Sequence, residues 1–218
     1  MIKIEMHCHS APASRCGKIG VDVIVPELKR CGYDAVVLTN HYFNVDTRSP
    51  EEIFGQMVCD YEDMKCLGDE IGLKVFFGTE LRFAGSSNDY LLYGMTPNEL
   101  RDMGPIYELD PERFLAQKPE HVLIYQAHPF RKNMTRTPAE FLDGIEIYNG
   151  HPGHESQNDL ALARAREFGM LVMSGSDTHF EEGIARGGVY LPSMPKNERE
   201  LAQMLRGVTE ADIIRPAE

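Results

Sequence analysis

The chain has 218 residues, of which 42% are hydrophobic and 26% are charged, a balance typical of one medium-sized soluble globular domain. It carries 22 Lys and Arg against 34 Asp and Glu, and the resulting net charge of −12 disfavours binding along a long nucleic acid. No long apolar run, signal peptide or Cys-x-x-Cys pair occurs, and the cysteines number five, so we expect a cytoplasmic protein with free thiols and no membrane contact.

In chain order, short apolar segments alternate with longer segments of helical periodicity. The expected strands cover residues 2–6, 34–39, 73–79, 89–94, 121–127, 144–149, 170–175 and 187–191. The expected helices cover residues 21–32, 49–72, 110–117, 155–169 and 196–207. Several expected strands are apolar at nearly every position, as strands covered on both faces are. The alternation favours one parallel α/β domain over residues 1–218, either a small irregular (β/α) barrel or an open doubly wound sheet.

Histidines and carboxylates follow the expected strands at the points where these strands end. Because parallel strands covered by helices have their carboxyl ends on one side, we expect these side chains to meet at one rim. His7 and His9 stand two residues apart on one strand, so both face the same side, about 6.6 Å apart. His121 begins the strand that His128 ends, so we expect it near the opposite end. The expected rim set is His7, His9, His41, Glu80, His128, Asp177 and His179.

Imidazole and carboxylate ligands together suit zinc, manganese or iron. Glu80 can bridge two such ions, which would share the charge that develops on a substrate. A single histidine after a strand is more often a surface or hydrogen-bonded residue than a ligand. Seven suitable residues at strand ends are hard to obtain by independent placement, so the set predicts a site for divalent metal ions.

The same residues lie in motifs that resemble those of the PHP (polymerase and histidinol phosphatase) domain family. These motifs are, in order, EMHCH (5–9), TNH (39–41), GTE (78–80), AHP (127–129) and GSDTH (175–179). Four further segments resemble one branch of that family, namely SRCG (14–17), NDYLLYG (88–94), QAHPFR (126–131) and IEIYNG (145–150). The resemblance implies a distorted (β/α)7 barrel, two or three divalent metal ions (Zn, Mn or Fe) and hydrolysis of phosphate esters.

The resemblance also implies how the ligands are shared among the ions. The first ion would be held by His7, His9, Glu80 and Asp177. Glu80 would bridge this ion to a second, which His128 also holds, and a third ion would be served by His41 and His179.

Three places depart from the family pattern. Asn40 replaces the usual Asp of the second motif, and an amide supplies a hydrogen bond but no charge. Met95 stands where some members place another histidine. The loop 13–16, which can give a ligand to the third ion, offers Ser14, Arg15 and Cys16. The second and third ions therefore rest on fewer matching residues than the first.

Four arginines near the rim are candidate ligands for a phosphate group, because a guanidinium fork matches phosphate oxygens. They are Arg15, Arg82, Arg131 and Arg186, of which Arg82 and Arg131 lie close after predicted metal ligands. The expected reaction is attack of a metal-bound hydroxide on the phosphorus of a small phosphomonoester or short nucleotide. We expect His41, Asp177 and His154 to act in catalysis, with His154 or His151 giving a proton to the leaving alcohol.

Two other functions fit the same pattern. Amidohydrolases also place a His-x-His pair on the first strand of a barrel and hydrolyse C–N bonds, but they usually carry a metal-bridging Lys, and no Lys stands at a matching strand end here. A non-catalytic metal-binding PHP module is the second alternative, although degenerate ligands would then be expected. Glu146 and Asn149 end a strand at the same rim and are candidates for positioning ligands or water.

Overall fold

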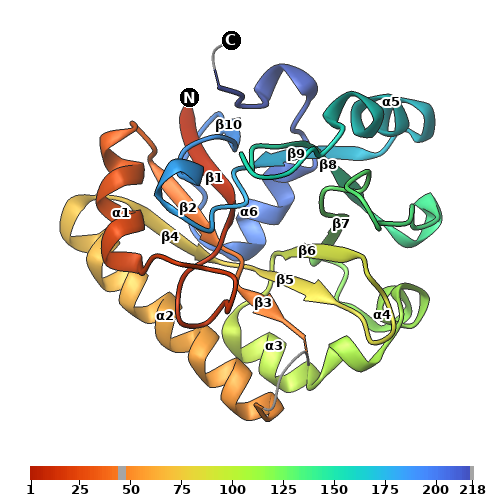
Figure 1. Ribbon diagram of the computed structural model, residues 1–218, viewed down its shortest axis with the longest axis horizontal. Helices are drawn as coiled ribbons and strands as arrows, with labels where there is room; N and C mark the ends of the chain where they lie inside the picture. Colours follow the sequence, from red (N-terminus) through yellow and green to blue (C-terminus); the bar gives the residue numbers. More distant parts are fainter. Residues whose placement is uncertain (44–47, 217–218) are drawn as a thin grey trace.

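The computed structural model describes residues 1–43 and 48–216 and has a mixed α/β fold (Figure 1). Its strands form two sheets in which most of the pairs are parallel. The first sheet, in the order β10-β1-β2-β4, consists of β10 (Val189–Leu191), β1 (Ile2–Cys8), β2 (Ala35–Leu38) and β4 (Lys74–Phe77). The second sheet, in the order β3-β5-β6-β7-β8-β9, consists of β3 (His41–Tyr42), β5 (Thr79–Arg82), β6 (Asp89–Tyr93), β7 (Leu123–Gln126), β8 (Gly144–Asn149) and β9 (Leu171–Gly175).

The chain passes from the first sheet to the second at two neighbouring places. One lies between β2 and β3, and the other lies between β4 and β5, where Gly78 separates the strands. A Cβ on Gly78 would lie 2.8 Å from Cγ1 of Val37 and 3.2 Å from the carbonyl oxygen of Leu92, so a side chain does not fit at this crossing. The single strand expected over residues 73–79 is therefore two strands that belong to different sheets.

The expected distorted (β/α)7 barrel is found only in part. The ends of β1 and β9 adjoin, because the Asp177 N–H donates to the His7 carbonyl oxygen at 2.8 Å and the His9 N–H donates to that of Thr178 at 3.1 Å. Among the described residues this junction is an isolated bridge rather than a ladder, so the strands do not close into one hydrogen-bonded barrel. The single sheet of the doubly wound alternative is not found either, since the strands divide into two sheets.

The parallel arrangement that the alternation predicts is found for most strand pairs but not for those of β6 and β10. Strand β6 runs antiparallel to both β5 and β7, with Asp89 opposite Arg82. Strand β10 runs antiparallel to β1. The amino end of β6 therefore lies where its neighbours have their carboxyl ends, which changes the residues that reach the rim.

Six α-helices occur in the described part of the chain. They are α1 (Val21–Arg30), α2 (Pro50–Ile71), α3 (Pro97–Met103), α4 (Pro111–Gln117), α5 (Asn158–Phe168) and α6 (Glu198–Leu205). Helix α2 begins with a capping box, in which the Ser49 side chain accepts a bond from the Glu52 N–H, and it ends at Gly72 with a φ of 75°. Helix α3 was not expected, although Thr96 and Glu99 form the same kind of box.

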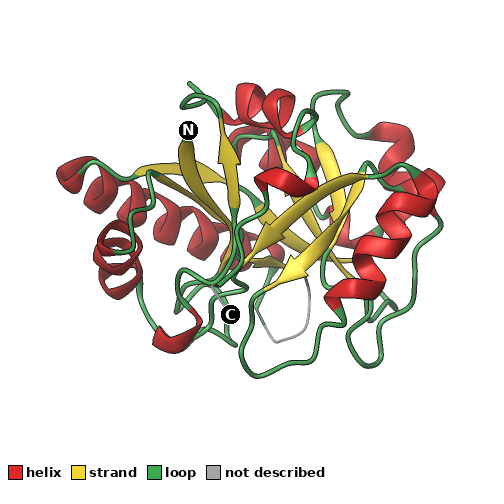
Figure 2. Ribbon diagram, turned by 90° about the horizontal axis from the view of Figure 1, so that it is seen from above, coloured by secondary structure: helices red, strands yellow, loops and turns green. Residues whose placement is uncertain are grey.

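Buried residues cover both faces of the strands, as their composition predicts. In β2, Ala35 and Val37 belong to a buried cluster with α5 and α6, while Val36 and Leu38 belong to one with α1 and α2. Figure 2 shows helices on both sides of the strands. None of the helices within residues 1–43 and 48–216 combines the length and the apolar character needed to cross a bilayer.

Candidate metal centre

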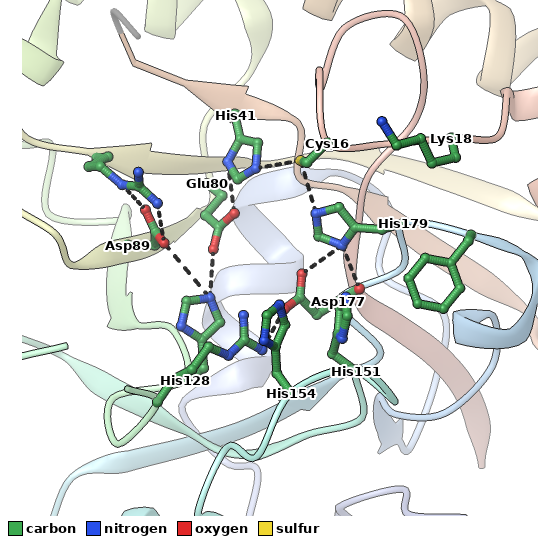
Figure 3. Close-up of a pocket in the computed structure, with 13 residues that line it drawn as sticks. Cys16, Lys18, His41, Glu80, Asp89, His128, His151, His154, Asp177 and His179 are labelled. Atoms are coloured by element: carbon green, nitrogen blue, oxygen red, sulfur yellow. Dashed lines mark hydrogen bonds and ion pairs between the residues drawn. The ribbon is translucent and has the colours of Figure 1, made fainter. Parts of the chain in front are cut away.

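The structure brings all seven predicted ligands together at the carboxyl ends of the parallel strands. His7 lies in β1 and His9 directly follows it, His41 lies in β3 opposite Glu80 of β5, and His128 follows β7. Asp177 and His179 follow β9. Most of these side chains are buried, and those of His41 and His179 are only 15% and 14% exposed. Figure 3 shows five of the seven around one cavity.

The first group of potential ligands consists of His7, His9 and Asp177. The two Nε2 atoms lie 3.1 Å apart, and each lies 3.5 Å from Oδ1 of Asp177. Glu80 faces the same point, with its carboxylate oxygens 3.4 Å from Nε2 of His7 and 3.2 Å from that of His9. These atoms are the four ligands that the resemblance implies for a first ion.

Hydrogen bonds on the far side of the rings orient both imidazoles. Nδ1 of His7 lies 3.0 Å from Oε1 of Glu146, and Nδ1 of His9 lies 3.1 Å from Oγ of Ser14. A carboxylate oxygen can only accept, so Nδ1 of His7 carries the proton, and the Ser14 hydroxyl already donates to Asn40, so Nδ1 of His9 donates as well. When the rings are neutral, both Nε2 atoms therefore have a free lone pair. Histidines that bind metals commonly have their other ring nitrogen fixed by a hydrogen bond in this way.

The second group consists of Glu80, Asp89 and His128. Nε2 of His128 lies 3.2 Å from Oε1 of Glu80 and 3.9 Å from Oδ2 of Asp89. Asp89 is not among the predicted ligands, because strand-end positions alone do not point to a residue that begins a strand. Asp89 is the first residue of β6, and this strand runs antiparallel to its neighbours, so its amino end lies at the rim.

The third group consists of His9, His41 and His179. Nδ1 of His41 lies 2.9 Å from Oε2 of Glu80, and Nδ1 of His179 lies 2.9 Å from the carbonyl oxygen of Asp177. The thiol of Cys16 lies within 3.0 Å of Nε2 of both His41 and His179. Cys16 is one of the three residues of the loop 13–16 that the resemblance offers for a third ion, and it is the one whose side chain reaches both histidines.

The polar residues behind the ligands link the elements of the centre. The Glu5 carboxylate accepts bonds from the N–H groups of Met6, His7 and Ser176, and burial raises the pKa of Glu5 to about 7. Asn40, which stands where the PHP motif that this chain resembles has Asp, accepts a bond from the Ser10 N–H and donates from Nδ2 to the Ser10 hydroxyl. An aspartate at position 40 could not make the second bond.

The surroundings of Asp177 and Glu80 favour the ionised form of both carboxylates. Burial acts to raise the pKa of Asp177, but the neighbouring imidazoles and the Arg131 guanidinium hold it well below its usual value. The pKa of Glu80 is likewise held well below 4.5, since His41 and His7 outweigh the effect of burial. Burial acts to lower the pKa of His7, but the surrounding carboxylates raise it well above 6.5. The pocket thus attracts positive charge, either protons or metal cations.

A cavity of about 400 Å³ lies over the second and third groups. Its wall includes Arg82 and Arg131, two of the four arginines expected to bind phosphate, and also Lys18 and Phe180, which were not expected. Among the described residues, those that line this cavity do not include Arg15 or Arg186. The Arg186 Nε donates to the carbonyl oxygen of Gly150 at 2.8 Å.

Both arginines of the wall already contact carboxylates. Arg82 makes a two-bond contact with Asp89, with donor–acceptor distances of 2.6 and 2.8 Å. Arg131 donates to Oδ2 of Asp177 at 2.8 Å and to Oδ1 of Asn149 at 2.8 Å. They help to orient two potential metal ligands, and their remaining N–H groups are the ones that a phosphate group would use.

His151 and His154 line the cavity, with ring centroids 4.5 Å apart. Burial is the main cause that lowers the pKa of His151 to about 4, and burial and Arg131 lower the pKa of His154. Both rings are therefore neutral at pH 7 in the free protein. Either ring would gain a proton more readily next to the negative charge of a bound phosphate.

His121 lies outside this centre, as the sequence analysis expected. Its Nε2 lies 3.2 Å from Oε1 of Glu99 and close to Arg199. Glu146 and Asn149, which were expected at the rim, lie directly behind the ligands, where Asn149 donates to both Glu146 and Asp177.

Comparisons with known proteins show similarity in fold. No family model matches the sequence, and no curated protein matches it either. A two-domain protein from Bacteroides vulgatus that contains a predicted PHP-like metal-dependent phosphoesterase is similar to 94% of this chain, with a TM-score of 0.65 and 19% identity. The chain spans 63% of the length of that protein.

Two other solved structures match nearly their whole length. A candidate metal-dependent phosphoesterase from Bifidobacterium adolescentis has a TM-score of 0.55 and 16% identity, covering 95% of this chain and 97% of its own. An amidohydrolase from Chromobacterium violaceum with bound sulfate and no metal has a TM-score of 0.56 and 16% identity, covering 99% and 98%. At these identities the similarity concerns the fold alone.

Proposed function

We propose that residues 1–218 form one PHP-type domain that hydrolyses a small phosphomonoester, or a short nucleotide, with the help of two or three divalent metal ions. The observation that carries this proposal is the convergence of the seven strand-end ligands into three groups beside a cavity of about 400 Å³. The cations Lys18, Arg82 and Arg131 on the cavity wall support a phosphorylated substrate. The similarity in fold to PHP-like phosphoesterases supports the family and the hydrolase activity.

The residues of the centre fit the metal ions that the proposal requires. The donor set of imidazoles and carboxylates suits zinc, manganese or iron, and the protons on Nδ1 of His7 and His9 leave Nε2 of each ring available. When bound, such ions supply Lewis acidity and activate water for attack at phosphorus. Glu80 is placed to bridge two of them, since its oxygens face both His9 and His128.

The remaining residues of the cavity bind the substrate and move protons. Arg82, Arg131 and Lys18 offset the charge on the phosphate oxygens and align the phosphorus with the metal centre. His154, or its neighbour His151, takes a proton when the phosphate binds and gives it to the leaving alcohol oxygen. His41 and Asp177 act in catalysis through their positions beside the ions.

Size and charge support a small substrate. A cavity of about 400 Å³ accommodates a phosphorylated metabolite, and the net charge of −12 opposes long nucleic acids. All five cysteines are free, which supports the proposed cytoplasmic location.

The test compares purified wild-type protein with the variants His7→Ala and His121→Ala, by elemental analysis and by turnover across a panel of phosphorylated metabolites. We expect His7→Ala to lose metal and to reduce turnover at least about 100-fold, because several kcal/mol of charge stabilisation disappear. His121→Ala is the matched control, because its ring lies beside Glu99 and away from the centre. Full metal content and full turnover in His7→Ala would refute the proposal.

An amidohydrolase-like activity is the second candidate, because the amidohydrolase from Chromobacterium violaceum has a similar fold over 98% of its length. Turnover of aryl phosphates and of cyclic amides by the same preparation separates the two activities. A protein that binds metal but hydrolyses neither class, nor any member of the metabolite panel, would instead be a non-catalytic metal-binding module.

A further inference from the structure

The thiol of Cys16 lies between two histidines. Its Sγ is 3.0 Å from Nε2 of His41 and 2.9 Å from Nε2 of His179, as the dashed lines of Figure 3 show. Nδ1 of His179 donates to the carbonyl oxygen of Asp177, and Nδ1 of His41 faces Glu80. Both Nε2 atoms therefore direct lone pairs at the sulfur, and one S–H proton can satisfy only one of them. A cation among the three atoms would satisfy all of them.

The loop that carries Cys16 is attached to the two histidine segments. The Lys18 N–H donates to the carbonyl oxygen of His179 at 2.7 Å, and the His41 N–H donates to Oγ of Ser14 at 3.1 Å. Gly17 is tightly enclosed, since a Cβ there would lie 3.1 Å from the carbonyl oxygen of Ser14. The sulfur is thus held in place on both sides of the cluster, as a ligand must be.

We infer that Cys16 binds a divalent cation as a thiolate, together with His41 and His179, and makes this position of the centre selective for zinc. The inference rests on the metal centre of the proposed function. The sulfur–metal bond forms as the S–H proton leaves to solvent, so binding releases one proton at this residue. Thiolate and imidazole ligands favour zinc, whereas carboxylates accept manganese or iron as well.

The consequence is a centre whose metal positions differ in the type of their ligands. The groups around Asp177 and Asp89 contain carboxylates, while the group around Cys16 contains sulfur and two imidazoles. A mixture of zinc and manganese should therefore load unevenly, with zinc held at the sulfur-containing position and exchanged there most slowly.

The test uses cobalt(II), which reports sulfur ligation through a thiolate-to-cobalt charge-transfer band in the near ultraviolet. Metal-free wild-type protein, Cys16→Ser and Cys66→Ser are each titrated with cobalt(II), and bound zinc is counted separately by elemental analysis. Cys66→Ser is the matched control, because Cys66 is also a free, exposed cysteine but lies on α2. We expect the band in the wild type and in Cys66→Ser, and we expect Cys16→Ser to lack it and to bind one zinc fewer.

A second variant keeps the experiment decisive if serine disturbs the loop. Cys16→Asp supplies a short carboxylate, and we expect it to regain the lost equivalent of metal without the band and with a weaker preference for zinc over manganese. Cobalt bound to the wild type without the band, or a band that persists in Cys16→Ser, overturns the assignment of Cys16 and leaves the proposed function standing. If neither cobalt nor zinc binds to any of the proteins, both the assignment and the proposed metal centre fall.

Discussion

Glu146 contacts two of the candidate metal ligands, His7 and His128, with one carboxylate. Its Oε1 holds Nδ1 of His7 at 3.0 Å, and its Oε2 accepts bonds from the His128 N–H at 2.8 Å and from Nδ2 of Asn149 at 2.9 Å. The side chain is fully buried, so no solvent replaces a lost bond. It therefore links the first and second groups of ligands through a single carboxylate.

We predict that Glu146→Gln weakens metal binding by about 10- to 100-fold, because a Gln amide has a single acceptor oxygen, so either Nδ1–H of His7 or the two donors that now reach Oε2 lose their acceptor. Competition with a chromophoric chelator measures the affinity. The exposed Glu167→Gln is the control and should bind metal as the wild type does. Equal affinity in Glu146→Gln and wild type would show that the carboxylate does not orient His7.

Among individual residues, the candidate ligands that could be predicted from the sequence are those whose position follows from strand geometry. His7 and His9 converge because alternate residues of a strand share a face, and His128, Asp177 and His179 converge because they follow parallel strands. Asp89 was missed because the direction of β6 is not encoded in its own residues. Lys18 was missed, and Cys16 could not be told apart from Ser14 and Arg15 as a ligand, because an irregular loop has no period from which the direction of a side chain can be deduced.

The close approach of β1, β9 and the segment before β10 is the feature of the elements that shapes the centre. A Cβ on Gly175, the last residue of β9, would lie 2.2 Å from Cβ of His7, and one on Gly187 would lie 2.3 Å from the Gly175 backbone. Only glycine allows this contact, and the contact places Asp177 beside His7.

We predict that Gly175→Ala lowers the free energy of unfolding by about 2–3 kcal/mol, because β9 must move away from β1. The same movement displaces His7, so metal content should fall with stability. Gly55→Ala is the matched control, since a Cβ on this exposed residue of α2 meets no atom within 4 Å and should stabilise the helix by about 0.5–1 kcal/mol. Urea unfolding measures both, and unchanged stability in Gly175→Ala would contradict the packing argument.

The sequence predicted most elements but not how they are connected. The apolar runs identified β1, β6, β7, β8 and β9, and the caps identified α2. Strand β3, with only two residues, is too short to give a pattern, and the separation of β4 from β5 depends on what surrounds Gly78 in the folded chain. Helix α3 has a readable cap at Thr96 but only seven residues, too few for a clear helical period.

For the whole molecule, the candidate metal centre lies where the two sheets meet. Its candidate ligands belong to or follow β1 of the first sheet and β3, β5, β6, β7 and β9 of the second. Among the described residues, the ends of β1 and β9 are connected only by an isolated bridge. Metal ions bound between these ends would therefore link the two sheets where no ladder of hydrogen bonds does. The division into two sheets could not be predicted, because strand pairing depends on contacts distant in sequence.

Metal ions should therefore stabilise the entire fold, and this stabilisation should increase with pH. The pKa of His7 is raised well above its usual 6.5, so its proton stabilises the metal-free fold at pH values below 6.5, and this contribution is lost as the pH rises through the raised value. A metal ion must displace the same proton, so its binding strengthens as the pH rises. An ion present at 100 times its dissociation constant adds about 2.7 kcal/mol to the free energy of unfolding.

We predict that zinc raises the Tm of chelator-treated protein more at pH 8 than at pH 6, as calorimetry would measure, and that His7→Ala shows a smaller increase in Tm at both pH values. An identical Tm with and without zinc at pH 8 would mean that the ligands gathered at the ends of the strands do not bind the ion.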